Sequence, residues 1–146
     1  MIKNSLRAFV NRVVEDKRTS GQDVKELRRD IISGGLICRE EADMLLALDR
    51  VVTPADGSWA EFLVSAIVEF AVWTSRPTGY IDADTARWLV ATLSAGHGPT
   101  ENAARIAFEV VKEAEKADEA LLAFAMRGAK HRTRRHEAEP AESVAA

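Results

Sequence analysis

Cysteine is almost absent from this sequence of 146 residues, in which Cys38 is the only one. A single cysteine excludes a disulfide within the chain and any zinc or redox site built on paired cysteines. We therefore expect a reducing compartment and predict a cytoplasmic location. Histidine is scarce too: His97, His131 and His136 lack the helical spacing of zinc ligands. The sequence predicts no cofactor.

Long hydrophobic runs and the common catalytic motifs are also lacking. The most apolar stretch, residues 62–73, contains Glu69 and is shorter than the roughly 20 residues that a membrane-spanning helix needs. No glycine-rich phosphate loop, nucleophile elbow or HExxH pattern occurs. The formal net charge of −3 indicates neither a nucleic-acid-coating protein nor a disordered chain. We expect no membrane partner and, on balance, no enzymatic activity.

Apolar residues are plentiful, at 47%, and recur at helical spacing over most of residues 1–126. Residues typical of helix starts precede several of these stretches, at Ser20, Ser58, Asp82 and Thr100, and a break is expected near Asp118. No convincing strand pattern is present. We predict one all-α domain of five to seven helices over residues 1–126.

The segment from Phe62 to Trp73 is apolar around most of its girth, which predicts the central helix of the fold. Trp59, Trp73 and Trp88 lie at positions expected to face the core. An exposed member of this trio would mark a partner surface.

An internal repeat is the most informative feature. GGLICREEADMLLAL from Gly34 matches TGYIDADTARWLVAT from Thr78, with Gly79 following Gly35 by 44 residues. Each copy has a Gly-x-Ile turn before an acidic helix start, which is the layout of an EF-hand. The repeat predicts two similar helix-turn-helix hairpins joined by a minimal two-stranded bridge between Ile37 and Ile81.

The calcium-ligand positions of these loops are poorly filled. Ile32 and Gly34 occupy ligand positions in the first loop, and Arg76 and Thr85 do so in the second. The sequence therefore predicts a degenerate, metal-free EF-hand-like core. The alternative is a weak divalent-cation or general-base site formed by the acidic residues around the helix starts: Asp30, Glu40, Glu41, Asp82 and Asp84.

The repeat over residues 24–95 resembles the small helical domains of the tellurite-resistance B-like group. Its phrase GLICREEAD, residues 35–43, is also similar to one found in uncharacterised proteobacterial proteins. The resemblance implies a bacterial, stress-linked or accessory helical module with a weak metal site among its acidic residues. The second loop departs from any metal-rich pattern.

The apolar pattern stops after Met126, and residues 127–146 form a basic and then acidic, alanine-rich segment that we predict to be disordered. Its basic residues could bind a nucleic acid or an acidic partner: Arg127, Lys130, Arg132, Arg134 and Arg135. The function that the sequence favours is a non-enzymatic protein-interaction or regulatory module. Another protein is the expected partner, with self-association through exposed apolar surface as an alternative.

Overall fold

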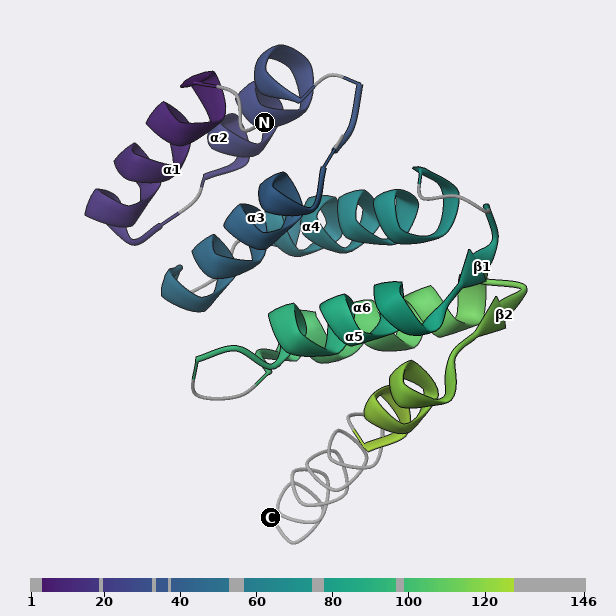
Figure 1. Ribbon diagram of the computed structural model, residues 1–146. Coiled ribbons are helices and arrows are strands. Elements are labelled where there is room, and N and C mark those ends of the chain that lie inside the picture. The colour runs from purple at the N-terminus through teal and green to yellow at the C-terminus, as the bar shows by residue number, and fades with distance from the viewer. Residues whose placement is uncertain are drawn as a thin grey trace, which may run out of the picture.

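The chain folds into a layered set of helices, as the ribbon of the computed structural model shows (Figure 1). The structure describes residues 4–18, 20–32, 34–36, 38–52, 57–74, 78–96 and 99–127. The all-α prediction is confirmed. Among the described residues, no helix combines the length and apolar character that crossing a bilayer requires. The predicted tail lies outside these residues from position 128 onward.

In the described part of the chain the elements form seven helices and two very short strands, and two of the helices consist of an α segment that continues into a π segment. Their bounds are α1 Asn4–Asp16, α2 Gly21–Glu26, the π-helix η1 Leu27–Ile31, α3 Arg39–Val51, α4 Gly57–Glu69, the π-helix η2 Phe70–Thr74, β1 Tyr80–Ile81, α5 Ala83–Leu93, α6 Glu101–Glu113 and β2 Lys116–Ala117. Residues 119–127 are helical as well.

Three of the four predicted helix starts are confirmed. Ser20, Asp82 and Thr100 precede α2, α5 and α6, and the side-chain oxygen of each accepts the backbone N–H three residues later, at 3.1, 2.8 and 3.0 Å. These bonds satisfy amides that have no partner within the helix. The prediction for Ser58 is wrong, because α4 already begins at Gly57 and Ser58 lies in its first turn.

The predicted repeat of two hairpins is present in the backbone. In each copy an α-helix continues directly into a five-residue π-helix, α2 into η1 and α4 into η2. A glycine with positive φ follows each π-helix, Gly35 at 86° and Gly79 at 83°. Glycine adopts this left-handed conformation without the steric cost that a Cβ imposes. The second hairpin then enters α5 as the first enters α3.

The strand pairing that the structure describes joins Ile81 to a segment that the sequence does not predict as its partner. Ile81 pairs in parallel with Ala117, and the predicted partner, Ile37, lies outside the described residues. The Gly79 carbonyl also accepts the amides of Glu115 and Lys116, at 2.8 and 3.3 Å. The break expected near Asp118 is confirmed, since α6 ends before β2 and helix resumes at residue 119.

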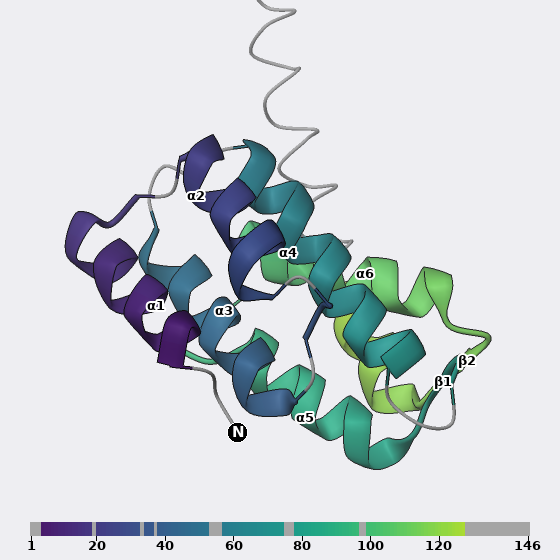
Figure 2. The ribbon, with the colours of Figure 1, turned by 90° about the horizontal axis from the view of Figure 1, so that it is seen from above.

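Helix α4 is the centre of the fold, as predicted. Seen from above, it lies between α2 and α6, while α1 packs on the outer side of α3 (Figure 2). Trp59, Leu63 and Ile67 of α4 are completely buried, in a core that extends from Leu6 to Ala125. The prediction that Trp73 is buried is wrong, because its side chain is 46% exposed. The wider π turn of η2 places three consecutive residues, 70–72, inward and Trp73 outward.

Candidate functional site

The acidic starts of α3 and α5 are held together by Arg39. Its guanidinium group contacts the Asp84 carboxylate at 3.0 Å and donates to the Thr85 hydroxyl at 3.2 Å. The same group lies 5.2 Å from the ring centroid of Trp88, whose indole N–H donates to Asp43 at 2.8 Å. This network connects α3 to α5, and the Arg39 guanidinium already neutralises part of the acidic cluster.

The five carboxylates predicted as a metal site have different environments. Glu41 is completely buried, whereas Glu40 and Asp30 are exposed. Asp82 caps α5, and Asp84 pairs with Arg39. Across the part of the chain that the structure describes, no three His, Cys, Asp or Glu side chains lie close enough to hold a metal ion. These residues do not converge on one cation position.

Two of these carboxylates have pKa values below their ordinary range. The backbone N–H and the hydroxyl of Thr85 both stabilise the charged form of Asp82, and so lower its pKa. The pKa of Glu40 is lowered by a hydrogen bond from its own backbone N–H and by one from the Cys38 side chain. Both carboxylates are therefore ionised at neutral pH, and Glu40 presents its charge to solvent. Cys38 itself is half-buried just before α3.

A buried carboxylate that the sequence analysis missed joins three elements. Asp49, near the end of α3, accepts hydrogen bonds from the Trp59 indole at 3.0 Å, the Thr100 hydroxyl at 2.6 Å and the Asn102 amide at 2.9 Å. The detectable signal was an acidic residue on the apolar face that includes Leu45 and Leu48. Its three donors make Asp49 a structural centre that fixes the ends of α3, α4 and α6.

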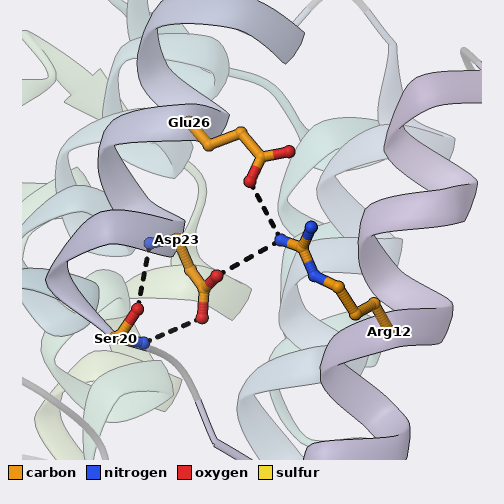
Figure 3. A network of polar contacts seen from close by, with 4 residues as sticks. All are labelled: Arg12, Ser20, Asp23 and Glu26. Carbon is orange, nitrogen blue, oxygen red and sulfur yellow. Dashed lines mark hydrogen bonds and ion pairs between the residues drawn. The ribbon is translucent and has the colours of Figure 1, made fainter.

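Helices α1 and α2 are tied together by charged groups (Figure 3). Arg12 donates to Asp23 at 3.2 Å and to Glu26 at 3.0 Å, while Asp23 also accepts the Ser20 amide at 3.0 Å. The hydrogen bond to Glu26 is the main reason that the pKa of Arg12 is raised above its ordinary value. The pairs are largely exposed, so they orient α1 rather than contribute much stability.

An open apolar groove lies between α1 and α3, and we call it the α1–α3 groove. Its volume is about 560 Å³. The side chains that line it are Val10, Val14, Glu40, Asp43, Met44, Ala47, Leu48, Arg50 and Val51. Helix α3 thus has two apolar faces, of which one is buried in the core and the other lines this groove. Val14 and Val51 remain 41% and 38% exposed, so the described fold leaves apolar surface open here.

The two ends of the α1–α3 groove carry opposite charge. Glu40 and Asp43 stand at the start of α3, and Arg50 stands near its end, where it donates to the Thr92 carbonyl at 3.2 Å. Val10 and Val14 lie on the apolar face of α1, whose helical spacing is visible in the sequence. The overlooked signal was that this face is wider than the buried line of Leu6, Phe9 and Val13.

The basic residues predicted to bind a partner lie mostly outside the described part of the chain. Arg127 is exposed at the end of the described helix, residues 119–127. The other four, Lys130, Arg132, Arg134 and Arg135, lie outside the described residues.

Comparison of the chain with models of protein families, with characterised proteins and with solved structures finds no match. The resemblance to the tellurite-resistance B-like group and to proteobacterial proteins therefore stays a prediction.

Proposed function

We propose that this protein is a non-enzymatic protein-interaction or regulatory module that binds an amphipathic helix of a partner in the α1–α3 groove. The observation that carries the proposal is the partly exposed apolar face of α3 along the groove, where half-buried Met44 and Ala47 and exposed Val51 lie one helical turn apart. Helix-in-groove recognition uses side chains at this spacing. Removing this apolar surface from water is the main favourable contribution that a partner helix would make.

The charges beside the groove favour one kind of helix. Glu40 and Arg50 are separated by roughly 15 Å along α3, from a rise of about 1.5 Å per residue. A partner helix with a basic residue at one end and an acidic residue at the other would meet opposite charge at both ends. Such complementarity selects the partner and its direction more than it adds affinity.

Site-specific photo-crosslinking tests the proposal. A benzophenone amino acid replaces Val51, which lies in the groove, and in a matched variant it replaces Phe108 of α6, which is 43% exposed but lies outside the groove. With extract of the source cells, we expect one discrete adduct from the groove position alone. The adduct protein is identified by mass spectrometry and then produced in pure form for the decisive binding measurement.

In that measurement, the purified partner should bind the unmodified chain and lose most of its affinity for Met44→Glu, which places a charge in the groove. An exposed substitution outside the groove, Arg87→Glu on α5, should bind as the unmodified chain does. Equal binding to Met44→Glu, or adducts from the Phe108 position only, would contradict a function of the groove.

A further inference from the structure

We infer that the helix occupying the α1–α3 groove is α3 of a second copy of this chain, packed antiparallel about a two-fold axis. This inference rests on the proposed function, because it names the partner for the same groove. The observation behind it is that α3 carries, along one face, both halves of the charge pattern that the groove favours: acid at its start, apolar side chains in the middle and Arg50 near its end.

The antiparallel arrangement pairs these features with their complements. If Met44 faces the partner's Ala47, the same register places Glu40 opposite the partner's Val51 and brings the partner's Arg50 next to Glu40 and Asp43. A large side chain then meets a small one at the centre, and opposite charges meet at both ends. Because a two-fold interface is isologous, each contact is made twice.

Glu40 and Arg50 have charge available for such contacts. Neither takes part in an ion pair among the described residues. Asp43 accepts the Trp88 indole N–H through one oxygen, and among the described residues no ion pair involves its carboxylate. A parallel copy would place like charges together at each end of the groove, so charge selects the antiparallel direction.

The packing in the complex follows from the groove's position. Each α3 would lie between the α1 and α3 of the other copy, so that four helices form one bundle across the two-fold axis. Val10 and Val14 of α1 would then cover the side of the incoming helix, and Val14 and Val51 would lose their exposure to water.

A charge-swap experiment tests the inference on the full chain. Sedimentation velocity over a range of concentrations should give twice the monomer mass for the unmodified protein. Glu40→Arg and Arg50→Glu should each weaken dimerisation by roughly tenfold or more, because each change creates two like-charge contacts. An equimolar mixture of the two variants should dimerise more strongly than either variant alone, since the acid introduced at position 50 then faces the base introduced at position 40, while its contact with Asp43 stays unfavourable.

Circular dichroism verifies that the variants are folded, and Arg87→Glu serves as a charge reversal outside the groove that should leave the dimer intact. Recovery in the mixture is a result that a general loss of stability in either variant would not produce. A monomeric unmodified protein, or a dimer that neither reversal weakens, would overturn the inference. If the protein is monomeric while the crosslink at position 51 still captures a different protein, the proposed function stands and only the second copy is rejected. If that crosslink also captures nothing, both fail.

Discussion

Asp49 shows how one residue can fix the junction of three helices. Its carboxylate is 7% exposed and accepts from Trp59, Thr100 and Asn102. Asp49→Ala removes the acceptor of the buried Trp59 indole and of the half-buried Thr100 and Asn102 side chains, so we expect the free energy of unfolding to fall by about 3 kcal/mol. Urea denaturation followed by circular dichroism measures the change.

The matched control is Glu61→Ala, which also removes a carboxylate, in this case one that forms an exposed ion pair with Arg105 at 3.2 Å. The Glu61 side chain is 71% exposed, so its loss should lower the free energy of unfolding by less than about 0.5 kcal/mol. Equal effects of the two substitutions would show that Asp49 is not the structural centre described above.

Two adjacent glycines provide an internal comparison of backbone conformation. Gly35 has a φ of 86°, and a Cβ built on it meets no atom within 4 Å. Gly34 also has open space, but its φ lies outside the left-handed range. Gly35→Ala should therefore cost about 1–2 kcal/mol through backbone strain alone, whereas Gly34→Ala should leave the free energy of unfolding unchanged or slightly raised. Thermal denaturation of the pair checks this difference, and an equal loss in both would exclude strain as its cause.

At the scale of elements, the hairpin repeat was predictable because it depends on local chemistry. Glycine at the turn and an acidic or hydroxyl residue at the cap act within a few residues, so Gly35, Gly79 and Asp82 have the roles expected of them. The partner of Ile81 was not predictable, because it depends on where the chain returns after α6. The exposure of Trp73 was missed for a related reason: a π turn shifts which face is inward without leaving a periodic signal.

The cap of α5 should make stability depend on pH. The folded pKa of Asp82 lies below its ordinary value of 3.8, because the folded state stabilises the charged form. Such a carboxylate contributes stability that is fully present above the unfolded pKa and is lost as the pH falls through the folded pKa. We expect Asp82→Ala to have a lower free energy of unfolding than the unmodified protein at neutral pH. This difference, the stability gap, should narrow as the pH falls below 3.8.

Chemical denaturation at a series of pH values measures this gap. The comparison variant is Asp84→Ala, whose carboxylate is exposed and makes no cap hydrogen bond. A gap for Asp82→Ala that stays constant from neutral pH to strongly acidic pH would contradict an electrostatic contribution of the cap.

At the scale of the whole molecule, the sequence could not separate the two faces of α3. Its periodicity reveals apolar positions, but Leu45 and Met44 look alike until the packing of α1, α4 and α5 decides which face is covered. The acidic helix starts illustrate the same limit of sequence-based prediction. The ion pair between Arg39 and Asp84 joins residues that are far apart in the sequence, so periodicity does not reveal it. The candidate site therefore emerged from the arrangement of helices rather than from a motif.

A folded dimer links stability to concentration, and this gives a test on the intact protein that requires no knowledge of the interface. Because only folded chains associate, raising the protein concentration should raise the melting temperature, by about 2 °C for each tenfold increase once the dimer predominates. Differential scanning calorimetry over a hundredfold range measures the slope. Glu40→Arg should show a much smaller slope, since it weakens association while it replaces an exposed side chain that the core does not use. Parallel slopes in the two proteins would place any self-association somewhere other than the α1–α3 groove.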